Sequence, residues 1–368
     1  MRPGNSRHPS RSLPVHEWPR ADRKAWEEAC RPGIRLKPGG GASHFAEASR
    51  KDFINRYGAY LGFVQRRGVL NAKAAAAAQV TRSNVNAYIA ELKERKLSSV
   101  TIWNCIYKLR RASQLLDPKR DFRWLIEMEN EAALVMTPRS KFERLVLTDR
   151  LVEAGLRLIA EAEKRPVSVE RARDIRNGLM IVILALSQIR LKNFVALEIG
   201  GSFKELDGSW WVSIPGSGTK NRRWIEKRIP QAFNHAIELY LNEARPILLK
   251  SPRPDKSPWI SEQTGQQFTY KNLGSLVSKI TFRTLGVDVS PHLFRAAAAS
   301  TAAVNVPGFP YLASVLLGQA DRRIADEHYK RTTSLSAANI YGDLVDQYLT
   351  SDMQAGTEMS ALPSKTDV

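Results

Sequence analysis

The sequence predicts a mainly α-helical protein with one small antiparallel β-sheet, divided into two folded domains. Apolar residues recur at three- and four-residue spacing over most of the chain, which is typical of amphipathic helices. Three short apolar segments separated by glycine-containing turns interrupt this pattern between residues 195 and 230, as expected for neighbouring strands. A basic linker at 137–144 separates the two helical regions.

The first 136 residues are expected to form an arm and a small domain. Residues 1–44 are rich in Pro, Gly, Arg and Ser, which predicts a flexible basic N-terminal arm. Residues 45–136 predict a domain of four or five helices. An alanine run at 72–79 favours a helix. Thr81 and Ser98 stand where the following two helices need N-caps.

Residues 145–350 predict the second domain, and the tail at 351–368 is expected to be disordered because it has no periodic pattern. The three short strands are expected at 197–199, 210–214 and 224–229. Helices are expected before and after them, at 148–163, 170–189, 231–249, 269–284, 291–305, 310–317, 321–330 and 334–350.

Composition narrows the class of protein. The 368 residues carry a formal net charge of +19 with a pI near 10.0, which favours a polyanionic partner such as nucleic acid. Two cysteines, Cys30 and Cys105, give neither a disulfide framework nor a zinc spacing, so a cytoplasmic protein is expected. The longest apolar run is too short to span a bilayer, and the basic N-terminus lacks an apolar signal core.

The most informative motif is the order Arg190, His292, Arg295, Tyr329. Arginines grip phosphate through paired hydrogen bonds, histidine moves protons near neutral pH, and a tyrosine oxygen can attack phosphorus. Ser290 and Pro291 read as a helix N-cap and first helical position, so His292 and Arg295 should share one helix face. These residue types suit strand transfer at a phosphodiester without a metal.

With those residues in place, the chain resembles the tyrosine recombinase (phage integrase) family. Four segments carry the resemblance: 185–197 around the first arginine, the basic turn at 218–223, Ser290–Arg295, and 316–319 followed by 327–329. The resemblance implies that 45–136 is a SAM-like core-binding domain that binds DNA. It also implies that 145–350 is a mixed α/β catalytic domain.

The resemblance also implies roles for the matching residues. Arg190 and Arg295 would hold the non-bridging oxygens of the scissile phosphate, and Tyr329 would form a 3′-phosphotyrosyl link. Lys220 would protonate the leaving 5′-oxygen and His292 would assist proton transfer. The predicted catalytic set is therefore Arg190, Lys220, His292, Arg295, Gln319 and Tyr329. Neither a metal nor another cofactor nor ATP is expected.

Three positions depart from the family pattern. Gln319 stands where His or Trp is usual, Ala296 where His is frequent, and Asn193 where an acidic residue is frequent. The prediction is a site-specific recombinase or integrase. A recombinase relative that binds DNA with weakened catalysis and a type IB topoisomerase-like enzyme remain the alternatives.

The expected partner is double-stranded DNA with specific recombination sites, bound by a homo-oligomer, most simply a tetramer, in a nucleoid-associated state. The apolar stripe of 334–350 is expected either to contact a neighbouring protomer, as the family resemblance implies, or to fold back onto its own domain. Phosphate contacts are expected from basic residues on polar faces, although a merely solvated surface would look the same. These residues are Lys93, Arg95, Arg110, Arg111, Arg222 and Arg223. The target sequence and the direction of reaction do not follow from the chain.

Overall fold

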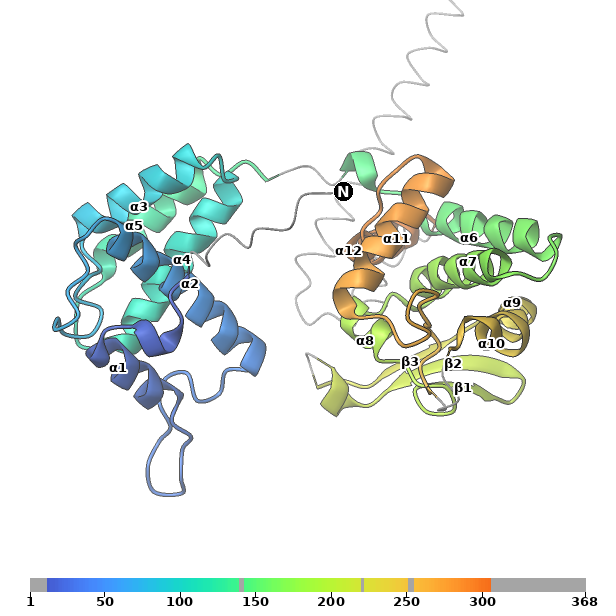
Figure 1. Ribbon diagram of the computed structural model, residues 1–368, viewed down its shortest axis with the longest axis horizontal. Helices are drawn as coiled ribbons and strands as arrows, with labels where there is room; N and C mark the ends of the chain where they lie inside the picture. Colours follow the sequence, from blue (N-terminus) through green and yellow to red (C-terminus); the bar gives the residue numbers. More distant parts are fainter. Residues whose placement is uncertain (1–11, 139–141, 220–221, 251–254, 306–368) are drawn as a thin grey trace, which may run out of the picture. The chain divides into compact units, whose positions relative to one another are not determined.

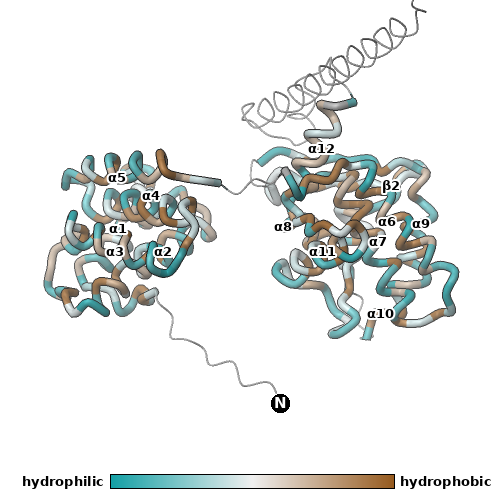
Figure 2. Tube along the Cα trace, turned by 90° about the horizontal axis from the view of Figure 1, so that it is seen from above, coloured by the Kyte–Doolittle hydropathy of each residue, from teal (hydrophilic) through white to brown (hydrophobic). Residues whose placement is uncertain are grey.

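The structure is a computed structural model that describes residues 12–138, 142–219, 222–250 and 255–305. The chain divides into two compact units, residues 1–140 and 141–368 (Figure 1). In each unit the hydrophobic stretches lie mainly toward the interior (Figure 2). The described part is mostly helical with one three-stranded antiparallel sheet, which confirms the predicted fold class. No helix within these ranges is long and apolar enough to cross a membrane.

The described part of the first unit, residues 12–138, is a bundle of five α-helices. They are α1 (Arg20–Cys30), α2 (Glu47–Arg66), α3 (Arg82–Glu94), α4 (Ser99–Leu116) and α5 (Arg123–Leu134), with a short 3-10 turn at Val15–Glu17. The side chains of Thr81 and Ser98 accept hydrogen bonds from the backbone of the helices they precede, as predicted.

The N-terminal segment corrects one prediction. Residues 12–44 are not a flexible arm, because α1 and the residues before it pack into the core of the helical bundle. Trp18 and Trp26 are buried there, and the Asp22 carboxylate accepts hydrogen bonds from the Tyr57 hydroxyl (3.2 Å) and the Ala77 backbone N–H (2.7 Å). Burial raises the pKa of Asp22, and these two bonds act in the opposite direction.

The alanine run at 72–79 corrects a second prediction. Residues 72–79 form turns instead of a helix. Ala77 adopts a left-handed conformation with φ of 55°. Its N–H binds Asp22 and its carbonyl accepts from Arg120 (3.2 Å), so long-range polar contacts outweigh the helix propensity of alanine.

In the second unit the helices lie mainly against one face of the sheet (Figure 1). Before the sheet lie a 3-10 turn (Phe142–Arg144), α6 (Thr148–Glu163), α7 (Val169–Ser187) and α8 (Leu191–Val195). The strands are β1 (Phe203–Leu206), β2 (Ser209–Ile214) and β3 (Ile225–Arg228), in that spatial order. After it come α9 (Asn234–Glu238), a π-helical stretch (Leu239–Ala244), α10 (Arg245–Leu248), α11 (Tyr270–Leu285) and α12 (Pro291–Asn305), with 3-10 turns at Gly216–Gly218 and Gln231–Phe233.

The first strand lies at Phe203–Leu206 and not at the predicted 197–199. Asp207 and Gly208 both have positive φ values, of 51° and 70°, and form the two-residue turn between β1 and β2. That turn pairs Leu206 with Ser209 and so sets β1 at 203–206. The segment predicted as a strand at 197–199 contributes buried Leu197 to the core instead.

Helix α7 runs through the core of the second unit and is held close to α6. A Cβ added to Gly155 on α6 would lie 2.7 Å from the carbonyl oxygen of Gly178 on α7, so the two backbones almost touch. The helices expected at 310–317, 321–330 and 334–350 lie outside the described residues.

Candidate active site

Arg190 is fixed by the way α7 passes into α8. Helix α7 ends at Ser187, and Gln188 takes a left-handed conformation with φ of 49°. Arg190 then caps α8, because its carbonyl accepts the N–H groups of Asn193 (2.8 Å) and Phe194 (3.0 Å). Its side chain is half-buried.

Phe194 anchors this corner in the core. Its ring is fully buried and stacks on Trp259, with 4.6 Å between the ring centroids. The Trp259 indole N–H also donates to the Phe194 carbonyl (2.9 Å). The backbone around Arg190 is therefore held by both packing and hydrogen bonding.

Arg295 reaches the same corner from α12. The neighbouring Leu293 and Phe294 are buried in the core, and the Arg295 guanidinium donates a hydrogen bond to the carbonyl of Gln188. Burial, and then the positive charge of Arg190, lower the pKa of Arg295 to about 10. Two arginines that are 105 positions apart in the numbering thus lie close enough for their charges to repel.

Lys227 adds a third cation that belongs to none of the sequence motifs. It lies opposite Val212 in the register, in the row of β3 that contains Ile225 and faces the core. Burial lowers the pKa of Lys227, and the charge of Arg295 lowers it further, so the ammonium group lies within electrostatic reach of that guanidinium. A lysine in the core-facing row of a strand, between Ile225 and Ile229, is the sequence signal that could have revealed it.

Of the other four predicted catalytic residues, the structure describes only His292. His292 is exposed in the first turn of α12, three positions before Arg295. Lys220, Gln319 and Tyr329 lie outside the described residues. Their place in the site remains a prediction.

Two amides at the Arg190 corner have atoms without a partner among the described residues. The side-chain nitrogen of Asn193 and the side-chain oxygen of Gln188 are buried and make no hydrogen bond there. Buried polar atoms of this kind are uncommon in folded proteins and often mark a functional position. Both belong to the turn that presents Arg190.

The basic residues predicted to contact DNA have different surroundings. Arg110 binds the Glu129 carboxylate at 2.6 Å, with both side chains about 15% exposed or less, and it therefore joins α4 to α5. Arg95 pairs with Glu91 at 3.3 Å. Of the remaining four, Lys93, Arg222 and Arg223 are exposed, and Arg111 is half-buried.

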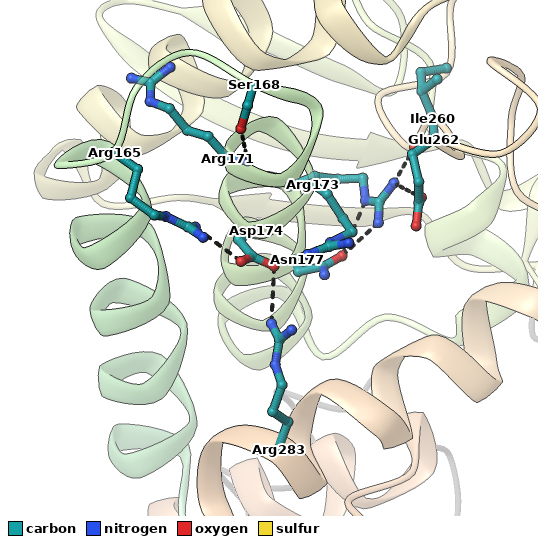
Figure 3. Close-up of polar contacts among 10 residues, drawn as sticks. Arg165, Ser168, Arg171, Arg173, Asp174, Asn177, Ile260, Glu262 and Arg283 are labelled. Atoms are coloured by element: carbon teal, nitrogen blue, oxygen red, sulfur yellow. Dashed lines mark hydrogen bonds and ion pairs between the residues drawn. The ribbon is translucent and has the colours of Figure 1, made fainter.

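A separate arginine-rich network stabilises α7 (Figure 3). The Asp174 carboxylate is only 8% exposed and accepts from Arg165 (3.0 Å), Arg173 (3.4 Å) and Arg283 (3.1 Å). Arg176 is fully buried and binds Glu262 at 2.6 Å. Because carboxylates neutralise these arginines locally, the network has a structural role.

Comparisons with known proteins place the fold. No protein-family model matches the chain, and no curated protein matches it in sequence. A solved structure of the Tn1549 transposon integrase in complex with a circular intermediate DNA is similar at a TM-score of 0.52 and 14% identity, over 86% of this chain and 95% of that one. The XerH site-specific recombinase bound to difH substrate, in a pre-cleavage complex, is similar at a TM-score of 0.50 and 15% identity, over 78% of each chain. The chain has the fold of these recombinases.

Proposed function

We propose that the protein is a site-specific DNA recombinase that cuts and rejoins strands through a 3′-phosphotyrosyl intermediate. The convergence of Arg190 and Arg295 at one corner of the second unit carries the proposal. Two guanidiniums that repel each other across a partly desolvated space form a site for an anion, and a phosphodiester supplies one. The similarity in fold to recombinases solved in complex with DNA agrees with this chemistry.

In the proposed reaction the arginines act on charge and Tyr329 acts on phosphorus. Arg190 and Arg295 donate hydrogen bonds to the two non-bridging oxygens and stabilise the negative charge that builds there. The Tyr329 oxygen gives up its proton, assisted by His292, and forms a bond to phosphorus. The bond from phosphorus to the 5′-oxygen breaks. Attack by a 5′-hydroxyl on the phosphotyrosine reverses the step without ATP.

The leaving 5′-oxygen needs a proton. Lys220 is the residue that the family resemblance implies for this role, and Lys227 is a second lysine near the arginine pair. A lysine whose pKa is lowered gives up its proton more readily, which suits a general acid. We assign Lys227 at least the role of a third cation beside the phosphate.

A trapping experiment with nicked DNA tests the proposal. The full-length protein is incubated with nicked duplexes made from the DNA that flanks its coding region, and covalent adducts are separated on a denaturing gel. Wild type should form an adduct, whereas Tyr329→Phe should bind the same duplexes without forming one.

The same gel separates the alternatives. Binding without any adduct would identify a recombinase relative that only binds DNA, the reading that Asn193 and Gln319 keep open. An adduct on any duplex, without preference for a site, would favour topoisomerase-like activity. Adduct formation by the Tyr329→Phe variant would assign the nucleophile elsewhere. Assembly of four protomers on paired sites is part of the proposal and would appear as a slower band on a native gel.

A further inference from the structure

Trp224 is unusual among the tryptophans of the chain. The structure describes all eight, and Trp224 alone has an exposed side chain, with 68% of its surface open to solvent. An indole ring carries a large apolar surface and is normally at least half-buried. An exposed indole therefore suggests a surface that meets a partner.

The local backbone holds Trp224 outward. The Thr219 hydroxyl lies within hydrogen-bonding distance of the carbonyls of Gly216 (3.1 Å) and Arg223 (2.8 Å) and ties the described ends of the β2–β3 connection together. Gly216 is required there, because a Cβ would lie 2.5 Å from the Arg222 carbonyl oxygen. Ile225 pairs with Ile214 on the core side of the sheet, so the preceding Trp224 projects to the opposite side.

Most of the charged residues near this ring and along its side of the sheet are basic. Arg222 and Arg223 directly precede it and are both exposed. On the same outer side of the sheet, the register aligns Lys204, Trp211 and Arg228 in one row across the three strands. Glu226 is the acidic residue on this side, opposite Ser213. Flat aromatic rings among cations match a partner that combines flat apolar rings with negative charge, as nucleic acid does.

We propose that Trp224, flanked by Arg222 and Arg223, inserts as an apolar wedge into a groove of duplex DNA while the two arginines bind the adjacent phosphates. The inference rests on the proposed function, because it places DNA against the same unit as the Arg190–Arg295 pair. Apolar side chains that enter a groove partly unstack a base step and bend the duplex. Trp224 would thus shape the DNA, separately from the cleavage chemistry.

The salt dependence of binding distinguishes a wedge from a charge contact. Affinity of the full-length protein for a fluorescent duplex is measured by anisotropy between about 50 and 200 mM salt. Trp224→Ala should weaken binding by roughly 5- to 150-fold, the range for losing one aromatic contact with a base, at every salt concentration and with an unchanged slope. The double variant Arg222→Ala, Arg223→Ala should instead lower the slope of log affinity against log salt by about 1.8.

A matched control and a direct readout complete the test. Phe282→Ala removes another exposed aromatic side chain (63% exposed) of the same unit, on α11, and should leave affinity unchanged. Duplexes with 2-aminopurine at successive positions should brighten at one step with wild type, where the base unstacks, and stay dark with Trp224→Ala.

Several outcomes would overturn the wedge. Equal affinities for Trp224→Ala and the Phe282→Ala control would do so, as would a changed salt slope in Trp224→Ala. Loss of binding to anionic lipid vesicles, with DNA affinity intact, would assign the ring to a membrane surface instead. A change only in oligomeric state would assign it to a second copy of the chain. Failure of the proposed function looks different: wild type would bind duplex and unstack a base, yet form no covalent adduct.

Discussion

Replacing Asp174 by asparagine should destabilise the second unit, because Asp174 is the centre of the network that fixes α7. Its carboxylate accepts from Arg165, which follows α6, from Arg173 on α7 itself, and from Arg283 in the last turn of α11 (Figure 3). Helix α7 ends at the turn that presents Arg190, so a loosened α7 would also loosen the candidate site.

The size of the effect follows from the exposure of the partners. A hydrogen bond to a charged group contributes about 1.5–3 kcal/mol. The three bonds do not add, because the arginine side chains are 43%, 34% and 51% exposed and can return to water when the carboxylate is lost. We therefore expect a loss of about 2 kcal/mol, the value of one such bond. That corresponds to a fall of about 4–8 °C in the Tm of a unit of this size.

The pH dependence gives a second readout. Burial raises the pKa of Asp174, but the hydrogen bonds from Arg165 and Arg283 and the nearby positive charges outweigh it, so the pKa lies below its ordinary value of 3.8. A carboxyl group with a lowered pKa stabilises the fold fully above that ordinary value and loses the contribution as pH falls through the native pKa. The gap in Tm between wild type and Asp174→Asn should be constant from about pH 7 to pH 5 and close below about pH 4.

Thermal unfolding of the full-length chain, followed by circular dichroism, measures both quantities. Glu153→Gln is the matched control in the same unit, because Glu153 lies 3.9 Å from Arg150 and 3.8 Å from Arg157 on an exposed surface and should contribute little. The reasoning fails if the two variants have equal Tm values at neutral pH. It also fails if the gap for Asp174→Asn persists unchanged in acid.

Three further changes probe the site and its support. Arg295→Ala should slow strand cleavage by about 100- to 1000-fold in single-turnover assays, far more than Arg222→Ala, because only the former stabilises developing charge; equal losses would remove the distinction. Lys227→Met should slow cleavage. A DNA substrate with sulfur at the bridging 5′ position, whose thiolate leaves without protonation, should restore the rate if Lys227 is the acid. Gly155→Ala should cost about 1–3 kcal/mol in denaturant unfolding because the added methyl meets the facing helix, whereas Gly201→Ala, with no atom closer than 3.6 Å, should cost far less.

The regular elements could be predicted because their signals are local. Thr81 and Ser98 cap helices through bonds from the third residue of each helix, and the apolar stripes of α2 and α4 face one core. The sheet was placed almost correctly for the same reason. Its first strand lies later than predicted, because the Asp207–Gly208 turn sets the register and pairs 203–206 with β2, although the segment at 197–199 is more apolar.

The N-terminal segment could not be predicted because its signals are distant in sequence. Pro- and Gly-rich composition favours an arm, yet Asp22 finds its partners at Tyr57 and Ala77, 35 and 55 positions away. The same bond turns an alanine run out of the helical conformation. A buried carboxylate thus contributes long-range bonds to two segments whose local composition favours other structures.

In the candidate site, the order of motifs in the sequence identified Arg190 and Arg295 but not the nearby Lys227. Arg190 and Arg295 were predicted from two motifs, and the hydrogen bond from Arg295 to the Gln188 carbonyl brings them to one corner. Lys227 was missed because it belongs to no motif: only the pairing of β3 with Val212 shows that it faces inward. Strand register is a property of the folded sheet, so the third cation became visible only with the structure.

Holding Arg190 and Arg295 close together costs free energy, and this cost indicates how the candidate site would work. Burial and the charge of Arg190 lower the pKa of Arg295 to about 10, so the folded chain holds that guanidinium against both desolvation and repulsion. The buried Leu293 and Phe294 beside it, and Phe194 stacked on Trp259 beneath Arg190, supply the packing that offsets this cost. A bound phosphate would relieve the repulsion, and the developing charge of a cleavage step would relieve it further. Donors fixed in place before the substrate arrives need no rearrangement during the reaction, which is the physical basis of catalysis by a preorganised site.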